Sequence, residues 1–153
     1  MFIFVRKTRQ NRTRFTIKLV GHSKLYLMKK VLYTPKAPAP IGPYSQAVLA
    51  GNTLYTSGQI AINPETGALH TNTIEEETHW VLKNLEAVLQ SAEMGFSEVV
   101  KCSIFIKNMD QFHQINEVYT QYFSENSPAR ETVEVARLPK DVNIEISCIA
   151  IKN

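Results

Sequence analysis

Two charged side chains in the C-terminal part of the chain could together bind and hydrolyse a small acid. Arg130 ends the segment "SPAR", and Glu145 lies between Ile144 and Ile146 in an apolar run. A guanidinium can bind a carboxylate through two parallel hydrogen bonds, and a carboxylate in an apolar segment must find a partner or change its pKa. The two groups could pair with each other from neighbouring strands, or they could bind an acid and activate a water. Residue types alone do not choose between these interpretations.

Four further residues lie where a site could form. Tyr44 follows Pro43 in a proline-rich segment, which excludes a regular helix and holds the ring on stiff backbone. Ser57 and Gly58 lie in "YTSGQI", where the glycine either forms a strand bulge or lets a ligand approach the backbone. Asn116 is close to the apolar stripe of a predicted helix, where an amide more often bonds the nearby backbone.

The composition is that of one globular domain. The chain has 153 residues, of which 44% are hydrophobic and 20% charged. Cys102 and Cys148 have no metal-like spacing, so we expect reduced core thiols in a cytoplasmic protein. No apolar run approaches the roughly 18 residues of a membrane span, and we expect no membrane partner.

Charge is distributed unevenly along the chain. Residues 1–30 contain nine Lys or Arg and no acidic residue, whereas residues 31–153 carry a net charge of about −6. The acidic part gives no argument for nucleic-acid binding. The basic extension, residues 1–27, is interpreted as a tail, a targeting segment or the product of an upstream start, because Met28 could begin the domain of residues 28–153.

Hydrophobic periodicity predicts two strands, a helix, a strand, a helix and two more strands. The predicted ranges are a hairpin of "AVLA" and "TLYTSG" around Gly51-Asn52, helices near 74–93 and 111–123, and strands at 98–107, 131–136 and 143–152. Thr73 with Glu76 predicts a capping box for the first helix, and Asp110 predicts the N-cap of the second. "LPKD" predicts a turn with Pro139 in its second position.

This order predicts an α+β sandwich, with two helices on one face of a mostly antiparallel sheet. The second face of such a sheet must be solvated or covered by a partner. Phe105, Ile149 and Ile151 fall on the opposite parity from the most apolar positions of their strands. We therefore expect another subunit to cover the second face.

Four stretches of the sequence resemble the Rid/YjgF family of enamine and imine deaminases, specifically the RidA group. They are "APAPIGPYSQAV", "YTSGQIAINPETG", "PAR" and "VEVARLPKDVNIEI", and the likeness runs from about Val31 to Lys152. No P-loop, dinucleotide fingerprint, nucleophile elbow or metal-spaced His or Cys cluster competes with this interpretation.

The resemblance implies a chorismate mutase-like fold, a homotrimer with a central barrel, and clefts between subunits. It implies hydrolysis of 2-imino acids such as 2-iminopropanoate and 2-iminobutanoate to 2-keto acids and ammonia, with no metal or organic cofactor. The matching site positions are Tyr44, Ser57, Gly58, Asn116, Arg130 and Glu145.

Thr132 departs from the family pattern, which usually has Cys two residues after the Arg, and this leaves the substrate range open. The backbone of Thr132 could still receive the imine N–H. Two alternatives remain: a trimeric protein that binds 2-keto acids without turnover, and a ribonuclease. The acidic domain argues against the ribonuclease.

Overall fold

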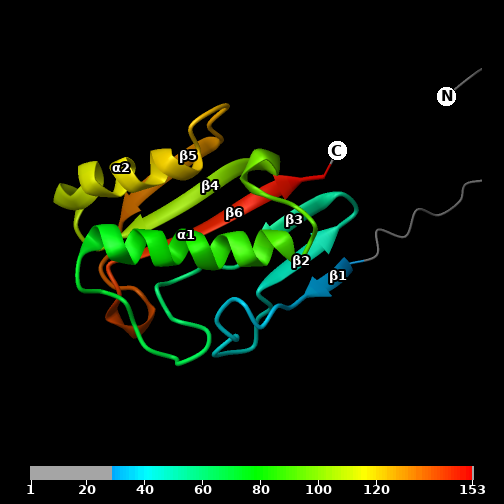
Figure 1. Ribbon diagram of the computed structural model, residues 1–153, viewed down its shortest axis with the longest axis horizontal. Helices are drawn as coiled ribbons and strands as arrows, with labels where there is room; N and C mark the ends of the chain where they lie inside the picture. Colours follow the sequence, from blue (N-terminus) through cyan, green and yellow to red (C-terminus); the bar gives the residue numbers. More distant parts are fainter. Residues whose placement is uncertain (1–28, 153) are drawn as a thin grey trace, which may run out of the picture.

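The computed structural model describes residues 29–152, which form a six-stranded sheet with two long helices on one face (Figure 1). The strands are β1 (Lys29–Leu32), β2 (Ala47–Ala50), β3 (Thr53–Thr56), β4 (Val99–Ile106), β5 (Ala129–Glu134) and β6 (Ile144–Ile151). The helices are α1 (Ile74–Gln90) and α2 (Phe112–Tyr122), with short 3-10 turns η1 (Phe96–Glu98), η2 (Met109–Gln111) and η3 (Pro139–Asp141). The basic extension and its proposed boundary at residue 28 lie outside the described residues.

The strand order is β1-β2-β3-β6-β4-β5, so the C-terminal strand lies in the middle of the sheet. Every neighbouring pair is antiparallel except β4 with β5, which is parallel because α2 crosses between them. The prediction of an α+β sheet with mostly antiparallel pairing is therefore confirmed. Strand β1 was not predicted, because "KKVL" has no alternation and becomes a strand by pairing with β2.

Helix α1 begins as the sequence predicts. The hydroxyl of Thr73 accepts a hydrogen bond from the backbone N–H of Glu76 at 3.1 Å. The side chain of Glu76 contacts His70 and Asn72 instead of returning to the backbone of Thr73, so only half of the expected box forms. The apolar stripe of α1 is buried against the sheet.

The prediction that Asp110 caps the second helix is wrong. Asn108 is the capping residue, and its Oδ1 accepts from the backbone N–H of Asp110 at 2.9 Å. The cap starts the 3-10 turn η2, and α2 follows directly from it. An Asn two residues earlier thus takes the role because the first turn is 3-10 rather than α-helical.

Alternate residues of the central strands face the two helices and form the main core. The alternating members from β4 and β6 are Cys102, Ile104, Ile106, Ile144, Ile146, Cys148 and Ala150, and Val99 joins them at the irregular start of β4. We call this side of the sheet the helix face. Both cysteines are free and buried, as predicted.

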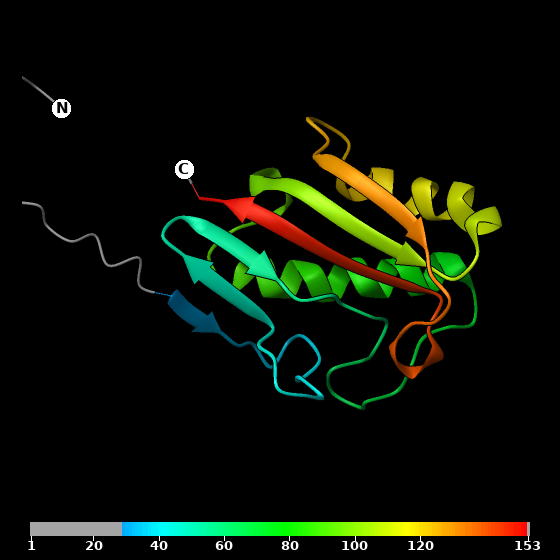
Figure 2. The same cartoon turned by 180° about the vertical axis from the view of Figure 1, so that it is seen from behind.

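The opposite side, which we call the open face, has no described helix over it (Figure 2). Glu145, Ser147 and Ile149 of β6 are half-buried there, and Tyr55 beside Ile149 is 49% exposed. The parity predicted for Ile149 is confirmed, and Glu145 shares it. No helix within residues 29–152 is long and apolar enough to cross a membrane.

Candidate functional site

One cavity of about 300 Å³ brings together four of the predicted site residues: Tyr44, Ser57, Gly58 and Glu145. They come from the proline-rich loop, the end of β3 and the start of β6. The rest of the wall is mostly apolar, and its other members are Pro38, Ala39, Ile41, Gln46, Gln59, Ile60, Ile62 and Pro139. The arrangement is that of a ligand cavity, with few polar groups on an apolar wall.

The loop that carries Tyr44 is held by a buried amide. Gln46 is 2% exposed; its Oε1 accepts from the N–H of Thr34 at 2.7 Å, and its Nε2 donates to the carbonyl of Pro38 at 2.8 Å. The hydroxyl of Tyr44 accepts from the N–H of Ile41 at 3.3 Å, and the residue is 48% exposed. Tyr44 therefore lies at the rim of the cavity on a loop fixed from beneath.

Gly58 has a specific reason to lack a side chain: Glu145 occupies the space. A Cβ built on Gly58 would lie 2.7 Å from Cγ and 2.5 Å from Cδ of Glu145, and closer still to Oε1. The sequence was compatible with two roles for this glycine, a strand bulge or close approach of a ligand. The structure shows a different reason: without a side chain, Gly58 leaves space for the carboxylate of Glu145.

The carboxyl group of Glu145 makes no hydrogen bond or salt bridge with any described residue, although the side chain is half-buried. Phe105 of β4 is its cross-strand neighbour on the open face. Burial raises the pKa of Glu145 above the usual value for a glutamate. The result is a carboxyl group whose basicity is increased by its apolar surroundings.

Ser57 contributes chiefly to the shape of the cavity. Its hydroxyl donates to the carbonyl of Ser45 at 2.6 Å, and its backbone N–H donates to the carbonyl of Gln46 at 2.9 Å. These bonds tie the end of β3 to the start of β2. Because the hydroxyl donor is already used, Ser57 can offer a ligand only its remaining acceptor capacity.

Arg130 lies in a second cluster, on the side of β5 that faces α2. Its Nη1 donates to Oδ1 of Asn116 at 2.8 Å, and its guanidinium carbon lies 4.8 Å from the ring centre of Tyr119 and 5.5 Å from that of Phe112. Asn116 therefore binds a side chain rather than the nearby backbone. Among residues 29–152, no carboxylate forms a salt bridge with Arg130.

The hypothesis that Arg130 and Glu145 pair from neighbouring strands is wrong. Strand β4 lies between β5 and β6, and Cys102 of β4 pairs with Arg130 on one side and Cys148 on the other. The two residues are thus separated by two strand spacings, or about 10 Å, and by three residues, or about 10 Å, along the strands. Their side chains also leave opposite faces of the sheet.

Two hydroxyl groups beside Arg130 are buried without a hydrogen-bond partner in the described chain, those of Thr132 and Tyr119. Thr132 shares the helix-face side of β5 with Arg130, two residues away, and pairs with Ile104. Its hydroxyl is covered by protein, so the side chain of Thr132 presents no polar atom to the surface.

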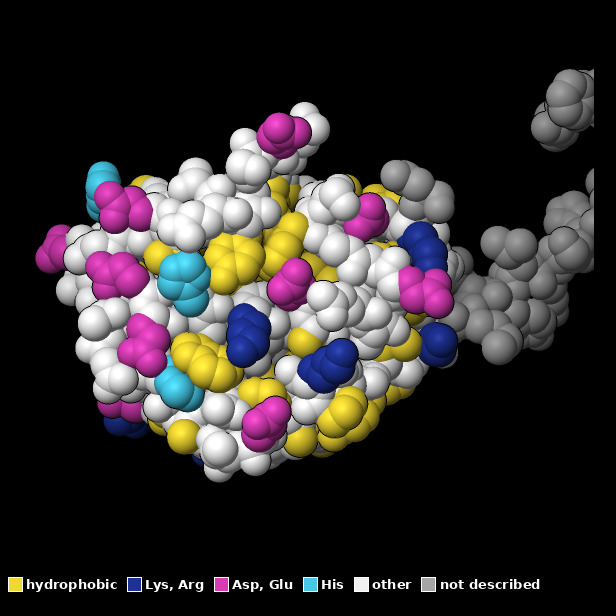
Figure 3. All heavy atoms as spheres, viewed as in Figure 1, with side chains coloured by type: hydrophobic (Ala, Val, Ile, Leu, Met, Phe, Trp, Pro, Cys, Tyr) yellow, Lys and Arg dark blue, Asp and Glu magenta, His cyan; other side chains and the backbone are white. Residues whose placement is uncertain are grey.

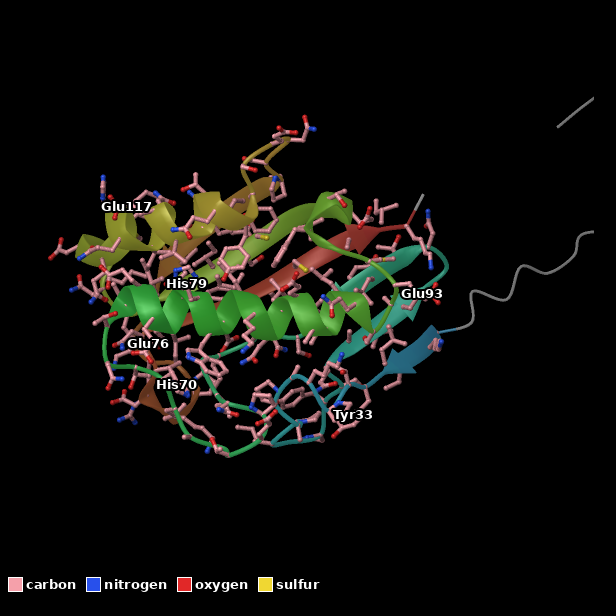
Figure 4. All side chains as sticks on the ribbon, in the orientation of Figure 1. Tyr33, His70, Glu76, His79, Glu93 and Glu117 are labelled. Carbon is pink, nitrogen blue, oxygen red and sulfur yellow. The ribbon has the colours of Figure 1, made fainter. Side chains whose placement is uncertain are left out.

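The histidines on the helix side of the molecule are engaged in other contacts (Figures 3 and 4). His70 stacks on Trp80 with 4.1 Å between ring centres, and its Nδ1 lies 3.0 Å from Oε1 of Glu76. The Nδ1 of His79 lies 3.0 Å from the hydroxyl of Tyr122. None of these residues lines the cavity that contains Glu145.

Two residues that hold the site were not predicted from the sequence, Gln46 and Tyr119. Gln46 follows Tyr44 by two positions, which is a weak signal, and Tyr119 gives no signal for a site, because it falls on the apolar stripe of the helix predicted near 111–123. Among the described residues, no group of three His, Cys, Asp or Glu side chains could hold a metal ion.

Comparison with known proteins places the chain among related sequences and folds. The family model described as endoribonuclease L-PSP matches residues 34–152. A RutC family protein of Pyrococcus horikoshii is 50% identical over 125 residues, which cover 82% of this chain and 99% of that protein. Human 2-iminobutanoate/2-iminopropanoate deaminase is 44% identical over 126 residues, covering 82% of this chain and 92% of that protein.

A solved structure shares the fold. The crystal structure of the YjgF gene product of E. coli is 42% identical and superposes with a TM-score of 0.77, covering 81% of this chain and 99% of that one.

Proposed function

Since the chain belongs to the endoribonuclease L-PSP family, which is the YjgF/Rid family, we propose that it hydrolyses 2-imino acids to 2-keto acids and ammonia. The substrate class is small imines such as 2-iminopropanoate, formed from 2-aminoacrylate, and 2-iminobutanoate. Relatives named as deaminases, at 44% and 46% identity, support this reaction over others.

The proposal rests on the guanidinium of Arg130, which is fixed in orientation but has no anionic partner among the described residues. Asn116 and two aromatic rings position Arg130, yet none of the described carboxylates neutralises it. Contacts with an amide and with ring faces fix the orientation of a guanidinium while leaving its charge uncompensated. A substrate carboxylate is the natural partner, because it can accept two parallel hydrogen bonds from such a group.

Glu145 supplies the base. In the proposed reaction its carboxylate accepts a proton from water while the hydroxide adds to the imine carbon, and the protonated carboxyl returns that proton to the nitrogen to give a neutral carbinolamine. The carboxylate then accepts the proton of the carbinolamine hydroxyl and passes it to the nitrogen; the C–N bond breaks, ammonia leaves and the carbonyl forms. Burial raises the pKa of Glu145, which makes its carboxylate a stronger base toward the water and toward the carbinolamine hydroxyl.

The separation of Arg130 from Glu145 supports an assembly in which each site uses two subunits. One chain keeps them on opposite faces of the sheet, whereas a small imino acid must reach both. We therefore propose the homotrimer implied by the family resemblance, with Arg130, Asn116 and the Thr132 backbone from one subunit facing Tyr44, Ser57, Gly58 and Glu145 from the next. The apolar side chains of the open face would be covered in the same assembly.

The experiment that tests the function generates 2-aminoacrylate in the cuvette and follows the release of pyruvate. Addition of the protein is expected to increase the rate above the spontaneous hydrolysis. Binding of 2-keto acids with no increase in rate would favour the binding-protein alternative and refute the proposal.

A further inference from the structure

Helix α1 carries two polar side chains that are completely enclosed, although neither belongs to the cavity wall. Glu77 is 0% exposed and Asn84 is 1% exposed. They are seven residues apart and so lie on the same face of the helix. Enclosing a carboxylate and an amide is costly unless their hydrogen bonds are made, so the contacts that they make are informative.

Glu77 binds the segment immediately before Glu145. Its Oε1 accepts from the backbone N–H of Asn143 at 2.6 Å and from that of Ile144 at 3.3 Å, and its Oε2 accepts from Nδ2 of Asn143 at 2.7 Å. Within residues 29–152 no basic side chain forms a salt bridge with Glu77. All three hydrogen bonds that its carboxyl oxygens accept come from donors of that one segment.

Asn84 binds the segment immediately after Gly58. Its Nδ2 donates to the carbonyls of Ile60 and Ile62, both at 2.9 Å. Both isoleucines line the cavity. The amide therefore fixes the backbone that forms one wall of the site.

The two fixed segments meet around Glu145. Gln59 and Ile146 exchange both backbone hydrogen bonds, at 2.8 and 3.1 Å. Glu145 thus lies between Ile144, which Glu77 holds, and Ile146, which is bonded to the segment that Asn84 holds. Its carboxylate in turn fills the space above Gly58.

We propose that Glu77 and Asn84 are positioning residues, which hold the two segments at the spacing that keeps the Glu145 carboxylate seated over Gly58. The effect of this positioning on catalysis rests on the proposed function. If Glu77 and Asn84 contributed only to stability, they would not both need to bind backbone beside this site. Glu77 binds the segment next to Glu145, and Asn84 binds the segment next to Gly58.

The test compares Glu77→Leu with Glu77→Gln. Leucine fills a similar volume but accepts no hydrogen bond. Glutamine keeps Oε1 as an acceptor for the two backbone N–H groups, and rotation of the Asn143 amide lets its oxygen accept from the new Nε2. We expect Glu77→Leu to lower kcat by roughly tenfold or more with KM changed much less, because small displacements of a catalytic group are costly. Glu77→Gln is expected to restore kcat to within about twofold of the wild type.

A second readout does not depend on turnover. The carboxyl group of Glu145, followed by ¹³C NMR, should titrate at a lower pH in Glu77→Leu than in the wild type, because a displaced carboxylate gains water. The titratable group that shares the cavity wall is Tyr44. The cation nearest in sequence to Phe105, the cross-strand neighbour of Glu145, is Lys107, which directly follows β4 and is bound to Asp141 at 2.8 Å. Both are present in each variant, so they do not account for a difference.

The outcomes separate the two proposals. A wild-type protein that accelerates no imine hydrolysis would refute the function, while the titration would still test positioning. An active Glu77→Leu with unchanged kcat and unchanged Glu145 titration would overturn the positioning role. If Glu77→Leu does not fold, Asn84→Ala removes both bonds to the carbonyls of Ile60 and Ile62, and an unchanged kcat and an unchanged Glu145 titration there would overturn the positioning role equally.

Discussion

Adding a single methyl group at Gly58 should displace the Glu145 carboxylate while leaving the fold intact. In Gly58→Ala the new Cβ would lie 2.7 Å from Cγ of Glu145 and 2.5 Å from Cδ. Ordinary carbon contacts are about 3.5–4.0 Å, so the side chain must move by roughly 1 Å or change rotamer. Overpacking of this kind costs about 1–3 kcal/mol of stability.

The effect on activity should be larger than the effect on stability. A displacement of about 1 Å in a reacting group lowers turnover by roughly 10²-fold. The assay is pyruvate release at a temperature well below the melting transition, with thermal denaturation measured in parallel. Gly95→Ala is the matched control, because the nearest atom to its Cβ would be 3.7 Å away and Gly95 is not among the residues that line the cavity. Gly58→Ala with wild-type kcat would refute the seating of Glu145 over Gly58.

Further predictions concern the guanidinium, the thiols and the assembly. Arg130→Lys should lower kcat/KM by roughly 10²-fold or more with the assembly intact, since Lys keeps the charge but loses the two-pronged geometry; wild-type values would place carboxylate binding elsewhere. Burial raises the pKa of Cys102 and raises that of Cys148 to about 12, so neither thiol should react with a disulfide reagent at pH 8 until the protein is denatured. Rapid labelling of the native protein would contradict their burial. Light scattering at micromolar concentration should give about three times the subunit mass, and a stable monomer would remove the two-subunit site.

The sequence predicted those parts of the fold that depend on local patterns. The hairpin at Gly51-Asn52, the stripe of α1 and the alternation of β4 follow from residue periods of 2 and 3.6, and each is present. Strand β1 could not be predicted in this way, because it is defined by its partner β2. Asn108 rather than the predicted Asp110 is the cap because the first turn is a 3-10 turn, and residue preferences do not determine the type of that turn.

For the site, the sequence could predict individual residues but not the residues that they contact. The resemblance selected Arg130 and Glu145, yet their placement on opposite faces depends on β4 lying between β5 and β6. Asn116 was expected to bond backbone, and only the packing of α2 beside β5 brings it to Arg130. The contact between Gly58 and Glu145 joins residues far apart in the chain, so no local pattern could reveal it.

Subunit mixing tests most directly whether an imine is hydrolysed between Arg130 of one subunit and Glu145 of the next, as we propose. Arg130→Lys and Glu145→Gln should each be nearly inactive alone, the second because it lacks the base, a loss of roughly 10²-fold or more. In trimers assembled randomly from equal amounts of the two variants, about one site in four receives both native residues, because closed symmetry pairs each subunit with a neighbour.

Co-expressed variants, with mixed trimers verified by native mass spectrometry, should therefore recover about a quarter of the wild-type kcat for pyruvate release. Mixed trimers that remain as inactive as the separate variants, beside an active wild type, would contradict the shared site.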